Sequence, residues 1–260
     1  MNDPQYEVYA IKHAQHARRA SENFIGGDPH DGPMPLDFFV WLIRGDGREM
    51  VVDTGFSAAT AARRQREHLR CPTEGLRLLG CDARAVRDVV ITHLHYDHVG
   101  NFDLFPAASF HLQDKEMQYA TGRHMAQPVF RGAFDLEDVV GMVRNAYAGR
   151  VKFHDGDAQI APGVSLHFIG GHTMGLQVVR VATRRGWMVL ASDASHFYAN
   201  MDEVRPFPIV FSVADMVEGY ARLRTLADSP AHIIPGHDPQ VLARYPAPST
   251  GLQGIVARLD

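Results

Sequence analysis

Short runs of apolar residues recur along the chain, and many of them are rich in β-branched and aromatic side chains. Such runs are typical of β-strands. A Gly-Asp-Gly turn at residues 45–47 lies between two of these runs and predicts a hairpin. The predicted strands cover residues 7–11, 36–43, 49–52, 88–92, 109–112, 164–169, 176–182, 187–191 and 232–234.

Stretches with helical character lie between these strands. Ser57 is a suitable N-cap for a helix over residues 57–69, and Gly80 is suitably placed to end a helix over residues 73–79. A Met- and aromatic-rich stretch at about 114–150 predicts a helical insert that glycine and proline residues interrupt. Because strands alternate with helices, the pattern predicts a layered α/β protein. The other predicted helices cover residues 57–69, 73–79 and 213–226.

Composition narrows the class of protein. The chain has 260 residues, 45% of them hydrophobic, and neither a linker nor an internal repeat, so we expect a single domain over residues 1–260. A net charge of −4 supplies no broad basic surface, which argues against nucleic acid as a partner. No apolar run is long enough for a membrane span and no signal peptide is visible, so we expect no membrane association and a cytoplasmic location.

The most specific motif has the pattern His-x-His-x-Asp-His, spans residues 93–98 and follows directly after a predicted strand. Alternate residues leaving a strand point the same way, so His93 and His95 can reach one metal ion. Asp97 and His98 lie at the following helical turn and can reach a second ion beside it. The spacing therefore predicts a site for two metal ions.

Three further candidate ligands follow later predicted strands, and each is flanked by glycine or another small residue that permits close backbone approach. Together with the motif they make a set of five histidines and two aspartates, which suits two borderline metal ions. The complete predicted set is His93, His95, Asp97, His98, His172, Asp193 and His237.

This set, in this order and after a Val-Asp-Thr-Gly segment that contains Asp53, resembles the metallo-β-lactamase superfamily. The resemblance implies the αββα metallo-β-lactamase sandwich, in which two mixed sheets are flanked by helices and a dinuclear zinc site lies along one edge. Manganese, iron and cobalt are the alternative metals. Asp53 is then expected to orient the ligands without binding metal itself.

The resemblance also implies how the ligands are shared, with three side chains on each ion and one aspartate between them. The first ion takes His93, His95 and His172, the second takes Asp97, His98 and His237, and Asp193 bridges the two.

Within the superfamily, the chain resembles the N-acyl homoserine lactonase branch. True β-lactamases lack the bridging aspartate, and flavodiiron proteins carry glutamate in place of His95. The Asp-Ala-Ser segment at 193–195 and the Gly-His-Asp-Pro segment at 236–239 are similar to lactonases. A glyoxalase II-like thioesterase and a hydrolase of another cyclic ester or amide remain alternatives, as does a non-catalytic metal-binding protein from a different class.

Two positions depart from that branch. The segment 170–176, Gly-Gly-His-Thr-Met-Gly-Leu, lacks the proline and the second histidine that lactonases usually carry. Lactonases also place a tyrosine three residues after the bridging aspartate, where this chain has His196, with Tyr198 two positions further on. Either side chain could donate a hydrogen bond to substrate, and we prefer Tyr198 because a phenol stays protonated at pH 7. The candidate catalytic residues are therefore Asp97, Tyr198 and His196.

We thus expect a metal-dependent carboxylic ester hydrolase. By the resemblance, a metal-bridging hydroxide opens the ring of an N-acyl homoserine lactone, an activity known as quorum quenching, or of another small lactone. Seven apolar side chains could roof the site and accept an acyl chain, or could instead pack in the core or in a homodimer interface. These are Phe24, Met34, Met117, Tyr119, Met125, Phe130 and Phe134.

Overall fold

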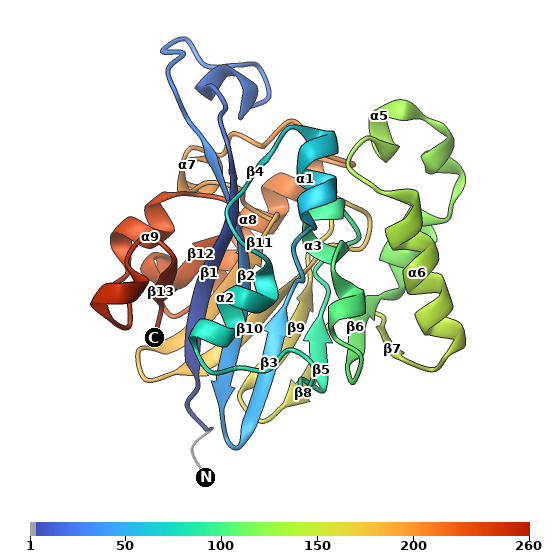
Figure 1. Ribbon diagram of the computed structural model, residues 1–260. Helices are drawn as coiled ribbons and strands as arrows, with labels where there is room; N and C mark the ends of the chain where they lie inside the picture. Colours follow the sequence, from blue (N-terminus) through green and yellow to red (C-terminus); the bar gives the residue numbers. More distant parts are fainter. Residues whose placement is uncertain (1–3) are drawn as a thin grey trace.

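The computed structural model describes residues 4–260, and within them the strands form two sheets stacked face to face (Figure 1). The first sheet has the order β13-β1-β2-β3-β5-β6-β7, with β4 paired to β1, and the second has the order β12-β11-β10-β9-β8. Each sheet contains antiparallel and parallel pairs, so both are mixed. The strands are β1 (Glu7–His16), β2 (Leu36–Gly45), β3 (Arg48–Val52), β4 (Glu67–His68), β5 (Asp88–Val90), β6 (Ser109–Gln113), β7 (Val151–His154), β8 (Ala158–Ala161), β9 (Val164–Phe168), β10 (Gln177–Thr183), β11 (Gly186–Ser192), β12 (Ile233–Pro235) and β13 (Val256–Arg258).

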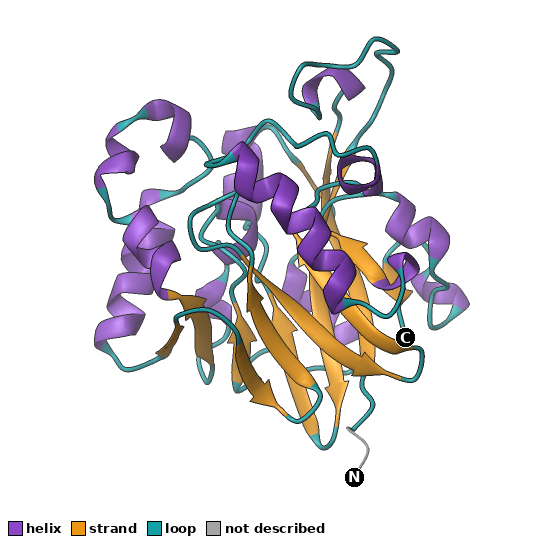
Figure 2. Cartoon of the chain, turned by 180° about the vertical axis from the view of Figure 1, so that it is seen from behind, coloured by secondary structure: helices purple, strands orange, loops and turns teal. Residues whose placement is uncertain are grey.

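Helices cover the outer faces of the sheets (Figure 2). Leu76 of α2, Tyr119 of α4 and Met142 of α6 are buried in one apolar cluster with residues of the first sheet. Tyr220 of α8 is buried in another cluster with the second sheet. The predicted αββα order of layers is therefore confirmed. The α-helices are α1 (Ala58–Arg64), α2 (Pro72–Leu78), α3 (Tyr96–Val99), α4 (Asp114–Ala120), α5 (Pro128–Arg131), α6 (Leu136–Tyr147), α7 (Tyr198–Asp202), α8 (Val213–Leu226) and α9 (Gln240–Arg244).

The main core fills the space between the two sheets. Trp41 of β2, Val178 of β10 and Leu190 of β11 are all completely buried there. In β2 the eight residues from Leu36 to Ile43 are all buried, because the sheets and helices cover both of its faces. This two-sided burial explains why β2 is continuously apolar from Phe38 to Ile43.

Local signals in the sequence specify several of the connections. β2 and β3 pair as the predicted hairpin, and Asp46 and Gly47 both have positive φ, 51° and 68°, as a tight two-residue turn requires. Ser57 caps α1 by accepting a hydrogen bond from the Thr60 amide, and Gly80 follows α2 with a φ of 74°. Both predicted helix ends are confirmed.

The predicted helix at 57–69 is too long. α1 ends at Arg64 because Gln65 adopts a left-handed conformation with φ of 56°, and residues 67–68 then pair with β1 as a short strand. The strands β7, β8 and β13 were not predicted, since each has only three or four residues and lies toward a sheet edge.

The predicted helical insert consists of α4, α5 and α6, with a 3-10 turn at Arg123–Ala126. Pro128, predicted as an interruption, occupies the first turn of α5, where its missing N–H costs no hydrogen bond. Among residues 4–260, no helix is both long and apolar enough to span a bilayer. Cys71 and Cys81 are free thiols.

Candidate metal centre

Loops that follow four strands bring seven titratable side chains together at one place in the sandwich. The chain leaves β5 into the 93–98 motif, whose second half forms the short helix α3. The loops after β9, β11 and β12 carry the other three side chains. The structure thus gathers all seven predicted ligands and adds His196. Their donor atoms fall into three groups within 4.8 Å: His93, His95, His172 and Asp193; Asp97, His98 and His237; and Asp193, His196 and His237.

The first group is a set of imidazole nitrogens that converge on one point. His95 Nδ1 lies 3.0 Å from His93 Nε2 and 3.0 Å from His172 Nε2. The Asp193 Oδ2 atom lies 3.1 Å from His172 Nε2 and 3.8 Å from His93 Nε2. Three nitrogens and one carboxylate oxygen in this arrangement match the ligand number of a tetrahedral metal site.

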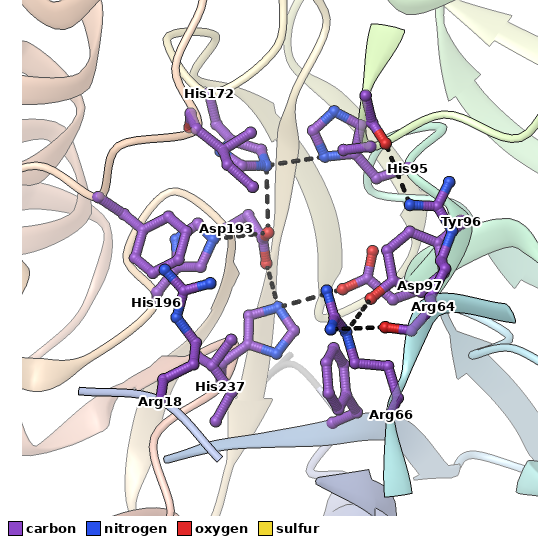
Figure 3. A pocket seen from close by; sticks show the side chains of 16 residues that line it. Arg18, Arg64, Arg66, His95, Tyr96, Asp97, His172, Asp193, His196 and His237 are labelled. Atoms are coloured by element: carbon purple, nitrogen blue, oxygen red, sulfur yellow. Dashed lines mark hydrogen bonds and ion pairs between the residues drawn. The ribbon is translucent and has the colours of Figure 1, made fainter. Parts of the chain in front are cut away.

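Asp193 also contacts two histidines of the second group. Its Oδ1 atom lies 2.9 Å from His237 Nε2 and 3.3 Å from His98 Nε2. Asp97 Oδ2 lies 3.8 Å from His237 Nε2 and 3.7 Å from His98 Nε2. The two oxygens of one carboxylate therefore face two separate ligand groups, so Asp193 can bridge two ions (Figure 3).

The outward nitrogens of the imidazoles already have partners. His172 Nδ1 lies 2.7 Å from the Ile209 carbonyl oxygen, and His237 Nδ1 lies 2.9 Å from the Asp37 carbonyl oxygen. A carbonyl oxygen can only accept, so each Nδ1 carries the proton and each Nε2 presents a lone pair inward.

Two inward atoms are buried without a hydrogen bond of good geometry, His98 Nε2 and Asp193 Oδ1. Buried polar atoms of this kind require a partner, and a cation at each group would supply it. The donor set of imidazole and carboxylate therefore fits a dinuclear metal site, and borderline ions such as zinc suit these ligands.

A buried hydrogen-bond network orients the motif. Asp53 Oδ2 lies 2.7 Å from His98 Nδ1, and the same carboxylate accepts hydrogen bonds from the amide and hydroxyl of Thr92 at 2.8 and 2.9 Å. Asp53 and Ser192 both have positive φ, 60° and 45°, a conformation that non-glycine residues rarely adopt. Such strain is typical of functional sites. Asp53 thus orients His98, as the sequence suggested.

Glu116 also orients the loops that carry metal ligands, a role that was not predicted from the sequence. This fully buried carboxylate on α4 accepts hydrogen bonds from Leu94 N at 2.9 Å, Thr173 Oγ1 at 2.6 Å and Gly175 N at 3.0 Å. It therefore joins the loop of the 93–98 motif to the loop of His172. A single glutamate within a helical insert carries no local signal of this contact.

The charges in the cluster are strongly coupled. Burial and neighbouring imidazoles hold the pKa of His93 and His95 well below its usual range. Burial also opposes charging of His98 and His237, but the Asp193 and Asp97 carboxylates, joined at His98 by Asp53, together outweigh it and raise the pKa of both. Burial would raise the pKa of Asp193, yet the surrounding imidazoles hold it well below its usual range. The neutral His93 and His95 keep free lone pairs at neutral pH, as metal binding requires.

The two candidate substrate donors occupy different places. His196 Nε2 lies 3.1 Å from Asp193 Oδ2, and its ring stacks on Phe207 with centroids 3.7 Å apart. Tyr198 does not line the pocket: it packs in the core between the sheets, with Arg244 over its ring. Its position gives no support to the preference for Tyr198.

The cluster forms one wall of a pocket with a volume of about 120 Å³ (Figure 3). None of the seven apolar residues predicted as a roof lines it. The alternative of core packing fits Phe24, which is buried. Met125 and Phe134 line a separate cavity, and the ring of Phe134 also packs against His95 with centroids 4.6 Å apart. Three arginines that the sequence did not single out line the pocket instead, Arg18, Arg64 and Arg66.

A family comparison identifies the fold and the motif together. The sequence model of the metallo-beta-lactamase superfamily matches residues 37–246, which contain all seven clustered ligands. The chain belongs to the metallo-beta-lactamase superfamily. The predicted resemblance is confirmed.

Curated relatives in this superfamily include lactonases. An N-acyl homoserine lactonase AttM from Rhizobium johnstonii is 32% identical over 177 residues, which is 65% of this chain and 65% of that protein. The chain thus spans less than two thirds of that relative. An N-acyl homoserine lactonase AttM from Rhizobium radiobacter is 28% identical over 238 residues, 84% of this chain and 88% of that protein.

Solved structures of the superfamily have the same fold. A quorum-quenching N-acyl homoserine lactone lactonase matches with a TM-score of 0.76 and 21% identity, covering 91% of this chain and 94% of that chain. AidC, a dizinc quorum-quenching lactonase in complex with a product, N-hexanoyl-L-homoserine, matches with a TM-score of 0.71 and 16% identity, covering 91% of this chain and 90% of that chain.

Proposed function

We propose that this protein is a dinuclear metallohydrolase that opens the ring of a lactone, either an N-acyl homoserine lactone or another small lactone. The observation that carries the proposal is Asp193, whose two oxygens face two groups of imidazole nitrogens. The lactonases among its relatives and the dizinc lactonase among its structural neighbours support both the reaction and the choice of zinc.

Each of the two metal ions would be bound by its own group of side chains. His93, His95 and His172 would hold the first ion, Asp97, His98 and His237 the second, and Asp193 both. When bound, a pair of such ions lowers the pKa of a shared water toward 7 and polarises a carbonyl oxygen. The outward hydrogen bonds to Ile209, Asp37 and Asp53 keep the rings of His172, His237 and His98 in the tautomer that this role needs.

His196 is the better placed of the two candidate donors. Burial lowers the pKa of His196 to about 3, so the ring is neutral at pH 7 and carries one proton. Its Nε2 atom faces Asp193 Oδ2 inside the pocket, while Phe207 holds the plane of the ring by stacking. A proton at Nε2 can therefore orient the Asp193 carboxylate or be donated to a substrate oxygen.

A glyoxalase II-like thioesterase is the second candidate. A thioesterase for glutathione conjugates needs cationic groups for the glutathione carboxylates, and Arg18, Arg64 and Arg66 line the pocket. This observation favours an anionic substrate without indicating whether the acyl group is attached through oxygen or sulfur.

A substrate panel on zinc-reconstituted protein tests the function. Ring opening of γ-butyrolactone and N-hexanoyl homoserine lactone is followed by proton release, beside thioester cleavage of S-lactoylglutathione. We expect lactone opening that chelation abolishes and zinc restores. Cleavage of the thioester alone would favour the second candidate, and lactone opening that survives complete metal removal would contradict both.

A further inference from the structure

Two guanidinium groups in the pocket have no carboxylate partner. Arg18 lies just after β1 and Arg66 lies between α1 and β4, so distant segments bring them to the same pocket as the His/Asp cluster (Figure 3). Within residues 4–260, neither side chain forms an ion pair, whereas the third arginine, Arg64, pairs with Asp135 at 3.0 Å.

Neighbouring groups hold the Arg18 side chain in place. Its Nε donates to Asn23 Oδ1 at 2.7 Å and its Nη2 donates to the Glu22 carbonyl oxygen at 2.5 Å. The ring of Phe207 lies 5.1 Å from its guanidinium carbon. The nearby Glu22 carboxylate accepts from the Arg19 amide at 2.7 Å. The Nη1 group of Arg18 makes no hydrogen bond within the described chain.

Arg66 is held in the same manner. Its Nε lies 3.1 Å from the Tyr96 hydroxyl, and its Nη1 donates to the Arg64 carbonyl oxygen at 2.7 Å and faces His16 Nε2 at 3.1 Å. Its Nη2 group makes no hydrogen bond within residues 4–260. Both guanidinium groups are thus fixed by neutral acceptors and keep an unused donor.

The two cations repel each other. Burial lowers the pKa of Arg18, Glu22 offsets part of this effect, and the positive charge of Arg66 lowers the pKa further. Asp97 and Asp193 line the same pocket, but their carboxylates face the imidazoles. Holding like charges together in a partly buried pocket costs stability, and a bound anion would relieve that cost.

The size of the pocket limits the ligand. Its volume is about 120 Å³, whereas an apolar protein cavity of about 150 Å³ accommodates benzene. The part of the ligand beside the His/Asp cluster is therefore no larger than a single small ring, and Arg18 and Arg66 line the same space.

We propose that Arg18 and Arg66 bind a carboxylate of the substrate, and that the pocket therefore takes a small lactone bearing a carboxylate in preference to a neutral lactone. This inference rests on the proposed lactone hydrolysis. The hydroxyl of water joins the carbonyl carbon, the ring C–O bond breaks, the ring oxygen takes up a proton, and the product is a hydroxy-dicarboxylate with release of one proton. The carboxylate formed at the attacked carbon stays beside the His/Asp cluster. Arg18 and Arg66 bind the other carboxylate, which the substrate carries before the reaction.

A matched pair of substrates tests the proposal. 5-Oxotetrahydrofuran-2-carboxylate and its carboxamide share one ring and differ in charge. We expect the wild-type protein to prefer the carboxylate by about 10- to 100-fold in kcat/KM, the range of one or two charged hydrogen bonds. Arg66→Met and Arg18→Met should each lose most of that preference and leave kcat/KM for the carboxamide within about threefold.

Two further variants control for folding and for general charge. Arg87 is exposed, lies outside the pocket and its side chain has no partner within residues 4–260, so Arg87→Met should behave as wild type. Arg66→Lys keeps the charge without the planar fork and should retain part of the preference. Equal losses on both substrates, or a wild-type preference for the carboxamide, would overturn the proposal while leaving lactone hydrolysis intact.

Binding separates this proposal from the proposed function. Calorimetric titration of zinc-loaded protein with glutarate and with butyrate compares a dicarboxylate with a monocarboxylate. The arginine variants should bind glutarate about tenfold or more weakly and butyrate as wild type does. If no lactone is opened, the proposed reaction fails, and the titration alone decides: a selective loss of glutarate binding supports the arginine site, and unchanged glutarate binding overturns it.

Discussion

The two sides of the pocket differ in how the chain builds them. On the His/Asp side all ligands but the half-buried Asp97 are buried, and they come from a compact motif and three strand ends. The outward nitrogens of His98, His172 and His237 are held by a carboxylate or a carbonyl. The arginine side comes from segments with no motif, and its guanidinium groups are partly exposed. On the proposed function, the reaction would depend on the motif and the strand ends and the choice of substrate on tertiary contacts, so the two would be encoded separately.

Removing the bridging carboxylate should have the largest effect and should not depend on the substrate. Asp193→Ala deletes both oxygens that face the two ligand groups, so we expect turnover of neutral and anionic lactones alike to fall to the level of metal-stripped protein. Steady-state kinetics with metal analysis measures this. The exposed Asp103 supplies the control variant Asp103→Ala. A loss confined to anionic substrates would erase the distinction between the two sides.

Glu116→Ala should be the most destabilising of the supporting changes. It leaves Leu94 N, Thr173 Oγ1 and Gly175 N buried without an acceptor, which should lower the free energy of unfolding by about 3 kcal/mol. Urea denaturation measures the loss, and Glu116→Gln should recover part of it because an amide oxygen still accepts. A loss below about 1 kcal/mol would show that the two ligand loops do not depend on Glu116.

Asp53→Ala should weaken metal binding and leave the preference between anionic and neutral lactones unchanged. Without Asp53, His98 loses the partner of its Nδ1 proton, and changes of this kind typically weaken metal affinity by about 10- to 100-fold. Competition with a fluorescent zinc chelator gives the affinity. Wild-type affinity in this variant would contradict the orienting role.

The smallest expected effect concerns Asp138, close to the Asp135 that pairs with Arg64, and the pH dependence of the free energy of unfolding. Burial and the nearby Asp135 raise the pKa of the Asp138 carboxyl to about 6. Because the folded state favours the protonated Asp138 carboxyl, the protein has its full stability at low pH. It loses part of that stability as pH rises through about 6 and the buried carboxyl ionises.

Asp138→Asn cannot ionise, so it should be more stable than wild type by about 1 kcal/mol at pH 8, after allowance for solvent screening, and no different below about pH 4. Thermal unfolding of metal-free protein at the two pH values measures this. A gain of the same size at both pH values would exclude titration of Asp138 as its cause.

The sequence predicted most of the frame and of the ligand cluster because both depend on local patterns. The helix at Val213–Leu226 has the predicted bounds, and its N-cap Ser212 accepts a hydrogen bond from the Asp215 amide. α1 was overestimated because Gln65, a residue without an obvious stop signal, takes the left-handed conformation that ends the helix. The side chains that lie outside a motif were missed: Glu116 bonds to segments distant in the chain, and Arg18 and Arg66 reach the pocket only through the tertiary fold.

Metal content is the most direct test of the central claim that seven side chains hold two ions with Asp193 between them. Protein reconstituted with zinc, desalted and analysed by mass spectrometry of the elements should hold two ions per chain, one for each group of ligands. His98→Ala, which removes a ligand from the second group only, should keep one. Less than one ion in the wild-type protein, or two tightly held ions in His98→Ala, would contradict the account.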